Sequence, residues 1–399
     1  MSAVSRISAR LIIDLAREHG FALASVTRAR PSAHTDYIRN WLAAGKHGTM
    51  VYLEQHFDER VDARVLVPGA RSVICVADVY RARPGDLSPP AAPDSPMGRF
   101  ASYAWGDDYH KVVKKRLFAM CDALRNRWPG HTFRAAVDTA PILEREHAQL
   151  AGLGWIGKHT LLINTQLGSY FVLGQIVTTL AIDDDDDDEA TAFDATDVDT
   201  CGDGGRVGDR DDHCGTCTRC IDACPTQCID PAGYKMDASR CISYLTIEHR
   251  GMIDQDLHEP LGYWIAGCDV CQDVCPFNQR PQANGQGSDA SDAQINGAPA
   301  RHVVPRADYS ARNMSLPLLD VLNWSAADRQ RAFTRSALKR AKLDMLKRNA
   351  LIAAGNYLKT RDDDALRRRV SALCDDIDEP ALVRETARQV VAQMNRRDM

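Results

Sequence analysis

The sequence predicts an α/β domain, followed by a small cysteine-rich module and a helical C-terminal region. Three observations lead to this fold class. Short apolar strands alternate with helical patterns over residues 1–182, ten of the thirteen cysteines lie between positions 201 and 275, and apolar residues recur at helical spacing from residue 315 onward. The chain has 399 residues, which is too long for one hydrophobic core. Its 44% of apolar and 26% of charged residues are typical of a globular protein and exclude a fibrous or wholly disordered chain.

The α/β domain is predicted from the order of its apolar segments. Asp107 or Asp108 can cap a helix that Pro129-Gly130 ends. Its apolar face consists of Val113, Leu117, Met120, Cys121 and Leu124. Five prolines between positions 84 and 96 indicate a loop. The remaining elements are a helix over 5–19 that Gly20 ends, buried strands over 72–77, 133–137 and 170–182, and a helix with Pro141 in its first turn and Gly152 at its end.

Residues 183–212 form a strongly acidic segment between the first two units. They hold 14 acidic residues against two arginines, a net charge of −12, which leaves +7 on the other 369 residues of a chain whose total is −5. Such a segment cannot bury apolar area, so we expect it to lack fixed structure. It is an inert insertion, a calcium-binding loop or an intramolecular mimic of RNA. The spacing of a calcium loop is absent, and inertness is favoured.

The second half of the chain divides in the same way. Residues 213–280 form the cysteine-rich module, 281–314 read as a linker, and 315–399 are predicted to be helical. Segments 351–358, 366–373 and 380–394 fit a short helical-repeat stack. Residues 334–369 hold 11 lysines and arginines against four acids, including Lys347 and Arg348. This basic patch is predicted to bind nucleic acid.

Neither a membrane span nor a secretion signal is predicted. The longest apolar run, 170–182, has 13 residues, whereas a bilayer span needs about 20. Charged residues interrupt the apolar positions of the N-terminal helix, so no signal core is present. We therefore expect a cytoplasmic monomer without a membrane partner, in which thirteen cysteines indicate metal or redox chemistry rather than disulfides.

The strongest signal is the run Cys214-x2-Cys217-x2-Cys220-x3-Cys224-Pro225, which matches the bacterial ferredoxin pattern. In that pattern three cysteines hold one [4Fe–4S] cluster and the fourth reaches a second cluster. A partner run, Cys268-x2-Cys271-x3-Cys275-Pro276, is one cysteine short, and Cys241 is the natural donor. The predicted ligand sets are therefore Cys214, Cys217, Cys220 and Cys275 for cluster one, and Cys224, Cys241, Cys268 and Cys271 for cluster two.

Two alternatives to this ligand assignment stay open. CxxC pairs also build structural zinc sites, although zinc needs no crossed pair of runs. Cys228 could replace Cys241, but it lies only four residues after Cys224, just past the turn. Neither a GxGxxG fingerprint nor a phosphate-binding loop is present, so neither NAD nor ATP is indicated.

Three segments add a resemblance to a known family. Residues 137–163 read VDTAPILEREHAQLAGLGWIGKHTLLI, residues 240–247 read RCISYLTI, and residues 267–278 read GCDVCQDVCPFN. Together with the ferredoxin run, they resemble the epoxyqueuosine reductases, which are cobalamin-dependent iron–sulfur enzymes of queuosine biosynthesis in tRNA. The resemblance runs from about residue 5 to 280 and continues weakly into the helical tail. The chain differs in its acidic segment, since the family has a short link there.

The resemblance implies a fold and a reaction. The fold is an α/β cobalamin-binding domain, a ferredoxin-like two-cluster domain and C-terminal helices resembling HEAT repeats. The reaction reduces the epoxide of tRNA-bound epoxyqueuosine to the alkene of queuosine, with two electrons and two protons consumed and water lost. Electrons would reach the clusters from an external donor such as flavodoxin or ferredoxin, and the clusters would reduce cobalamin to cob(I)alamin.

The resemblance also implies site residues. Asp138 would protonate the leaving oxygen, and its pKa would have to be raised by burial; without the resemblance, Asp138 or Thr139 reads as a helix cap. Because no DxHxxG motif is present, cobalamin is expected to bind without a protein ligand to cobalt. Apart from Asp138, the residues predicted to contact the corrin are Arg60, Lys158, His159, Leu162, Leu173, Ser243 and Asp269.

Two other functions compete with this one. Corrinoid reductive dehalogenases also combine cobalamin with two clusters, but they usually carry an export signal and lack a basic helical tail. A ferredoxin-type electron carrier or a non-catalytic tRNA-binding module would leave the α/β domain of about 180 residues unexplained.

Overall fold

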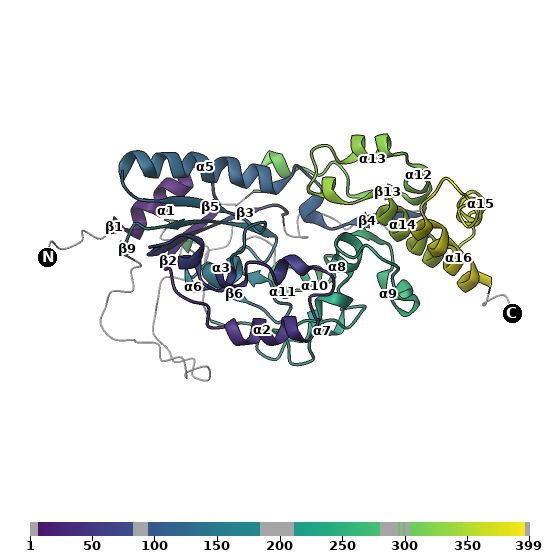
Figure 1. The fold of residues 1–399 in the computed structure, drawn as a ribbon, viewed down its shortest axis with the longest axis horizontal. Helices are drawn as coiled ribbons and strands as arrows, with labels where there is room; N and C mark the ends of the chain where they lie inside the picture. Colours follow the sequence, from purple (N-terminus) through teal and green to yellow (C-terminus); the bar gives the residue numbers. More distant parts are fainter. Residues whose placement is uncertain are drawn as a thin grey trace, which may run out of the picture.

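The computed structural model describes residues 7–82, 95–183, 211–279, 294–295, 298–299 and 304–395. Figure 1 shows an elongated molecule with the α/β unit at the N-terminal end and the helices of the C-terminal region at the other. The predictions for residues 184–210 of the acidic segment and for most of the linker 281–314 lie outside the described residues. No helix in the described part of the chain is long and apolar enough to cross a membrane.

A four-stranded sheet in the order β2-β3-β8-β5 forms the centre of the α/β unit. Its strands are β2 (Leu23–Arg28), β3 (Ser72–Val79), β8 (Phe171–Thr178) and β5 (Phe133–Ala136), and every neighbouring pair is antiparallel. β3 and β8 are buried along their whole length or nearly so, because helices cover both faces of the sheet. The strand β2 was not predicted. The predicted strand over 170–182 is in fact β8 followed by a turn and the short β9 (Ile182–Asp183).

Helices pack on both faces of this sheet (Figure 1). On one face, α1 (Ala9–Glu18) and α5 (Tyr109–Arg127) contribute Ile12, Leu117 and Leu124 to a buried apolar cluster. On the other, α4 (Ala63–Leu66) and α6 (Glu144–Leu150) pack Leu66 and Ala148 against the strands. The two clusters hold the sheet between two layers of helix. The sheet is antiparallel throughout, however, whereas the predicted α/β class has a mostly parallel sheet.

The predicted helix boundaries are right for α5 and wrong for α6. The Asp108 side chain caps α5, and all five predicted apolar residues are buried. Pro141 does not lie in the first turn of a helix, because α6 begins three residues later, at Glu144. The chain from Asp138 to Leu143 is therefore an irregular turn, which lets the side chains of this segment face the N-terminal end of α5.

Short elements connect the α/β unit to the cysteine-rich module. β6 (Trp155–Ile156) and β7 (Leu162–Ile163) form a hairpin that requires a glycine at position 154. Gly154 has a φ of +154°, and a Cβ at this position would lie only 2.0 Å from the carbonyl oxygen of Ile163. Other elements of this part are β1 (Ile7–Ser8), α2 (Thr35–Ala43), α3 (Phe57–Val61), α7 (Arg219–Asp222), α8 (Ile242–Ile247), α9 (His258–Leu261), α10 (Val270–Asp273) and α11 (Pro276–Gln279).

A second sheet joins all three parts of the chain. Its strands are β10 (Trp264–Ala266), β4 (Met97–Phe100) and β13 (Ser315–Pro317), with β4 in the middle. β13 was predicted to be helical, but it pairs antiparallel with β4. The helices that follow are α12 (Leu318–Asn323), α13 (Ala326–Phe333), α14 (Leu343–Leu358), α15 (Asp364–Ala372) and α16 (Ala381–Asn395). A two-stranded sheet of β11 (Gln294–Ile295) and β12 (Ala298–Pro299) lies in the linker.

Lys347 and Arg348 of α14 are buried, so their predicted place on a nucleic-acid-binding surface is wrong. Lys347 forms an ion pair with Glu379. Arg348 is fully buried and donates to the carbonyl oxygens of Leu245 at 2.6 Å and His249 at 2.8 Å, which lie at and just beyond the C-terminal end of α8. The guanidinium of Arg348 thus connects the helical region to the cysteine-rich module. Its positive charge is favourable next to the carbonyl groups at the C-terminal end of α8.

Arg348→Met is expected to destabilise the protein by about 2–4 kcal/mol, since it leaves buried carbonyl groups without a donor. Arg367→Met, which changes a half-exposed arginine of α15, should shift stability by no more than about 0.5 kcal/mol. Denaturant unfolding of the two variants measures the difference. Equal stability of both variants would contradict a structural role for Arg348.

Candidate active site and cluster-binding cysteines

Asp138 lies in the turn after β5 and faces the N-terminal end of α5. Its Oδ2 accepts a hydrogen bond from the Tyr109 hydroxyl, and its Oδ1 lies 3.1 Å from Nε2 of His110. The imidazole in turn contacts Asp108, whose Oδ1 is 2.7 Å from Nδ1. Asp108 therefore has two roles, because it caps the N-terminus of α5 and also orients the imidazole of His110 toward Asp138.

The contacts among Asp108, His110, Asp138 and Tyr109 determine the charges of His110 and Asp138 at neutral pH. Burial alone would lower the pKa of His110, but the hydrogen bonds with Asp108 and Asp138 raise it to about 9. Burial alone would raise the pKa of Asp138, but the hydrogen bond and the charge of His110, together with Tyr109, hold it below its usual value. The prediction of a raised pKa for Asp138 is thus wrong. The proton of the pair lies on the imidazole, and Asp138 is a carboxylate.

Further polar groups surround the pair. Burial raises the pKa of Glu144 to about 8, and the charge of Asp138 adds to this rise. The guanidinium of Arg340 contacts Glu248 at 2.8 Å, and Tyr103 and Tyr109 are among the groups that raise its pKa. Tyr103 packs edge-to-face against Tyr109, with ring centroids 5.8 Å apart. The site therefore combines two carboxyl groups, one imidazolium and one arginine beside a pair of tyrosines.

Sequence reasoning missed His110, Tyr109 and Glu144, and it predicted Arg340 only as one of the cations of the basic patch over 334–369. Tyr109 and His110 directly follow the Asp108 cap, so a histidine two residues after a cap was the available signal. Glu144 lies inside the segment 137–163, but nothing in its spacing separates it from an ordinary surface glutamate. Arg340 comes from the helical region, about 200 residues away from Asp138 in the sequence.

The first predicted set of cysteines is Cys214, Cys217, Cys220 and Cys275. Burial raises the pKa of the Cys220 thiol to about 11, and the neighbouring thiols that add to this rise are the other three of the set. Lys158, which was predicted to contact a corrin, lies beside this set. Its Nζ donates to the carbonyl oxygens of Gly215 at 2.6 Å and Cys217 at 3.1 Å, so it holds the loop that carries this set.

The second predicted set is Cys224, Cys241, Cys268 and Cys271. Burial raises the pKa of Cys268, and the thiols of Cys241 and Cys224 add to the rise. Cys271 is affected in the same way by Cys268 and Cys241. Cys275 packs in one buried cluster with Cys214, and Cys224 packs in another with Cys241 and Cys271. This packing is compatible with the crossed ligand sets, whose assignment stays a prediction.

Cys228 lies within the second set. Its Sγ is 3.4 Å from that of Cys224 and also contacts Cys241. These hydrogen bonds raise the pKa of Cys228, lower that of Cys224 to about 5 and lower that of Cys241. Cys228 thus lies between Cys224 and Cys241, closer to both than its place in the sequence suggested.

Two residues predicted to contact a corrin have buried polar atoms without a partner among the described residues. They are Nε of Arg60, on α3, and Nε2 of His159, in the β6–β7 hairpin. Nδ1 of His159 accepts from the backbone of Leu161 at 3.2 Å, and burial lowers the pKa of the imidazole to about 4. The neutral ring then carries its proton on Nε2, where it is available to a ligand.

The other predicted contacts are placed differently. Leu162 and Leu173 are buried in the apolar cluster between α6 and the sheet, so their side chains are core residues. Asp269 is buried, accepts from the backbone of Ser102 at 2.7 Å, and has its pKa raised to about 6 by burial. Ser243 lies in the first turn of α8, two residues after Cys241, and its backbone N–H donates to the sulfur of Cys241.

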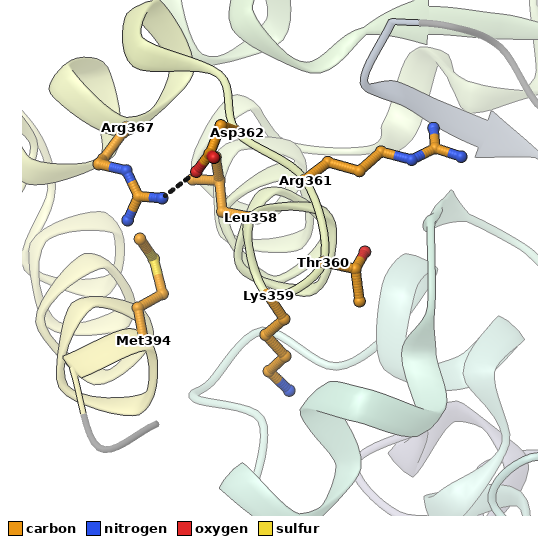
Figure 2. Close-up of a pocket in the computed structure, with 7 residues that line it drawn as sticks. All are labelled: Leu358, Lys359, Thr360, Arg361, Asp362, Arg367 and Met394. Carbon is orange, nitrogen blue, oxygen red and sulfur yellow. Dashed lines mark hydrogen bonds and ion pairs between the residues drawn. The ribbon is translucent and has the colours of Figure 1, made fainter. Parts of the chain in front are cut away.

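A pocket of about 360 Å³ lies elsewhere, at the C-terminal end of α14 (Figure 2). Arg367 of α15 reaches across it to Asp362 at 3.2 Å, and Met394 of α16 closes one side. None of its lining residues is a predicted site residue. The pocket is therefore distinct from the Asp138 cluster and from the cysteines.

Two family models match the chain. One is described as "4Fe-4S double cluster binding domain" and matches residues 213–278. The other is described as "Epoxyqueuosine reductase QueG, DUF1730" and matches residues 60–139. The first favours iron–sulfur clusters over structural zinc in the cysteine-rich module, and the second includes both His110 and Asp138.

Curated relatives cover nearly the whole chain. An epoxyqueuosine reductase from Xanthomonas campestris pv. campestris is 36% identical over 390 residues, which is 97% of this chain and 96% of the relative. Another from Synechocystis sp. is 37% identical over 335 residues, 82% of this chain and 98% of the relative. A crystal structure of epoxyqueuosine reductase with an epoxyqueuosine-modified tRNA stem loop shares the fold, with a TM-score of 0.76, 23% identity and coverage of 96% of this chain and 89% of that one.

These relatives settle the choice among the three functions that the sequence left in competition. They are oxidoreductases by name and cover most of the chain, and the two family models match its cysteine-rich module and the segment that contains His110 and Asp138. The chain therefore belongs to the epoxyqueuosine reductase family.

Proposed function

We propose that this protein reduces epoxyqueuosine to queuosine in tRNA, using cobalamin and electrons relayed by two [4Fe–4S] clusters. The observation that carries the proposal is the pairing of His110 with Asp138, in a chain that also carries the double-cluster module. Removal of an epoxide oxygen as water requires both electrons and protons, and the described residues offer a path for each. The α/β unit 1–182 would hold cobalamin and the module 213–280 would hold the clusters.

Cobalamin, when bound, supplies a strongly reducing cobalt centre that can attack the epoxide carbon. The unpartnered polar atoms of Arg60 and His159 fit the amide-rich rim of a corrin, to which both can donate. Leu162 and Leu173 would contact cobalamin through their backbone atoms, since their side chains are buried in the core. Ser243 and Asp269 lie close in sequence to the cluster cysteines Cys241 and Cys268. Lys158 would act indirectly, by holding the cysteine loop.

Asp138 delivers the proton to the leaving oxygen in this proposal. An alkoxide is a poor leaving group at neutral pH, so an acid must protonate it as the bond breaks. Asp138 receives that proton from His110, which stores it at neutral pH, while Asp108 stabilises the imidazolium. The Tyr109 hydroxyl fixes the other oxygen of the carboxylate.

The function is tested with anaerobically purified protein whose clusters have been reconstituted. We expect about eight iron atoms per chain. With cobalamin, a low-potential reductant and tRNA that carries epoxyqueuosine, nucleoside analysis should detect queuosine. Omission of cobalamin should abolish the product. Product formation without cobalamin would contradict the proposed chemistry, and a cluster-loaded protein that makes no queuosine would contradict the substrate.

We further propose that tRNA binds in the cytoplasm to a monomer, at the edge of the helical region closest to Asp138. Lys339, Arg340 and Lys342 are exposed there, and Arg340 interacts with both tyrosines of the site. The HEAT-like stacking expected of α14, α15 and α16 would hold this edge rigid. Flavodoxin or ferredoxin would deliver electrons on another face.

The variant Lys339→Ala/Lys342→Ala is expected to bind tRNA more weakly, because it removes two cations that pair with phosphates. The slope of log affinity against log salt should fall by about 0.7–0.9 for each phosphate that is no longer neutralised. Arg10→Ala/Arg388→Ala is the charge-matched control, since both arginines are exposed on α1 and α16. Fluorescence anisotropy at several salt concentrations measures the tRNA affinity of both variants and of the wild type. If both variants keep the wild-type slope, this edge is not the docking surface.

A further inference from the structure

Glu144 is a second carboxyl group in the site, and the proposed mechanism has not yet used it. It is the first residue of α6, and Nε2 of Gln175 holds its backbone carbonyl at 2.9 Å. Its Oε2 is buried and has no hydrogen-bond partner among the described residues. Leaving a charged carboxylate in such a place is costly, so the arrangement favours a neutral, protonated carboxyl.

The charged and titratable groups around Glu144 come from three elements. Asp138 lies in the turn after β5, His110 and Tyr109 lie on α5, and Arg145 is the next residue of α6. Burial and the charge of Asp138 raise the pKa of Glu144, while Arg145 and His110 lower it, with a net value of about 8. Asp138 is shifted the other way. The buried Oε2 of Glu144, which has no hydrogen-bond partner among the described residues, and the electrostatic interaction of Glu144 with Asp138 indicate that Glu144 stores a proton and Asp138 exchanges it.

We propose that Glu144 holds the second proton of the reaction and passes it to Asp138. The inference rests on the proposed function, which consumes two protons. Two C–O bonds of the epoxide break, two O–H bonds form, and the clusters supply two electrons. The first proton passes from His110 through Asp138 to the epoxide oxygen, giving a hydroxyl. The second passes from Glu144 to the Asp138 carboxylate and then to that hydroxyl, which leaves as water.

The first test needs neither cobalamin nor tRNA. Infrared difference spectra of the cluster-loaded protein, Glu144→Gln minus wild type at pH 7, should show the loss of a protonated-carboxyl band that shifts in D₂O. Glu146→Gln is the matched control. It lies on the same helix, but its carboxylate is partnered by Ser32 and His34 and its pKa is lowered. A wild-type spectrum in which Glu144 contributes no such band would overturn the proposal.

Stability gives a second readout on the same protein. Because the folded pKa of Glu144 is raised, the native state binds one more proton than the unfolded state between about pH 4.5 and 8, so this group makes stability fall as pH rises through that window. Glu144→Gln removes the effect. Its melting temperature should rise relative to wild type as the pH is raised from 5 to 8, whereas a constant difference would contradict a protonated Glu144.

The catalytic test separates a proton store from a corrin-binding group. Glu144→Gln should bind cobalamin like wild type but turn over about 10²-fold more slowly, and Glu144→Asp should recover part of the rate. The wild-type rate should fall above about pH 8, and this dependence should disappear in the glutamine variant. Wild-type turnover in Glu144→Gln, or failure of that variant to bind cobalamin, would overturn the role. If wild type makes no queuosine, the substrate proposal fails, while the infrared and melting results still report on Glu144.

Discussion

Replacing Asp138 with asparagine is expected to lower turnover by about 10²–10⁴-fold while both clusters and cobalamin still bind. Asparagine has nearly the same shape, and its Oδ1 can still accept from His110. It cannot take up and release a proton, however, and its amide cannot accept from the Tyr109 hydroxyl. The proton on His110 then has no route through this position to the leaving oxygen.

The measurement is the rate of queuosine formation under single-turnover conditions, with iron content and the cobalamin spectrum recorded for each variant. Asp122→Asn is the matched control, because this aspartate lies exposed on the outer surface of α5 and pairs only with Arg125 among the described residues. It should keep the wild-type rate. Near-normal reduction by Asp138→Asn would reduce Asp138 to a turn residue and would move the acid to His110 itself.

The same pair predicts the sign of a pH effect on stability. The folded pKa of His110 is raised to about 9 from an ordinary value of 6.5. Its contribution to stability is therefore fully present below pH 6.5 and is lost as the pH rises through 9. His110→Gln should remove this loss, so the melting temperatures of the variant and the wild type should converge toward pH 9.

The parts of the site that could be predicted depend on local spacing. The cysteines of each run are separated by two or three residues, so their short loops define a cluster site before any tertiary structure is known. The cap Asp108 could be found for the same reason. His110 and Glu144 could not, because their roles depend on how closely the start of α5 approaches the turn after β5, and such contacts between distant segments leave no periodic pattern.

Lys347 and Arg348 illustrate the opposite error. A density of positive charge in the sequence suggested a surface, yet α14 is the central helix of its region and is buried on nearly all sides. These buried cations are compensated, because Lys347 forms an ion pair with Glu379 and Arg348 donates hydrogen bonds to carbonyl groups after α8. Composition gives the charge of a segment, but only packing decides which of its faces meets solvent.

Cys241→Ser is expected to remove one cluster, so that iron falls from about eight to about four atoms per chain, whereas Cys228→Ser should keep about eight. Both thiols lie near Cys224, so distance alone does not show which of them is the ligand. The hydrogen-bond donors around each thiol distinguish Cys241 from Cys228. The backbone N–H groups of Ser243 and Tyr244 also donate to Cys241 and help to lower its pKa, which favours the thiolate that binds iron.

Among the described residues, no such backbone donor shifts the pKa of Cys228. Its hydrogen bonds with Cys224 and Cys241 raise its pKa, which disfavours the thiolate that binds iron. Iron analysis, visible absorption and the electron paramagnetic resonance of the reduced clusters measure the outcome for each variant. Because Cys228 donates to the sulfur of Cys224, its serine variant should retain the cluster with at most a shifted reduction potential. If Cys228→Ser instead loses four irons and Cys241→Ser keeps eight, Cys228 is the ligand, and the two backbone donors at the start of α8 have only a structural role.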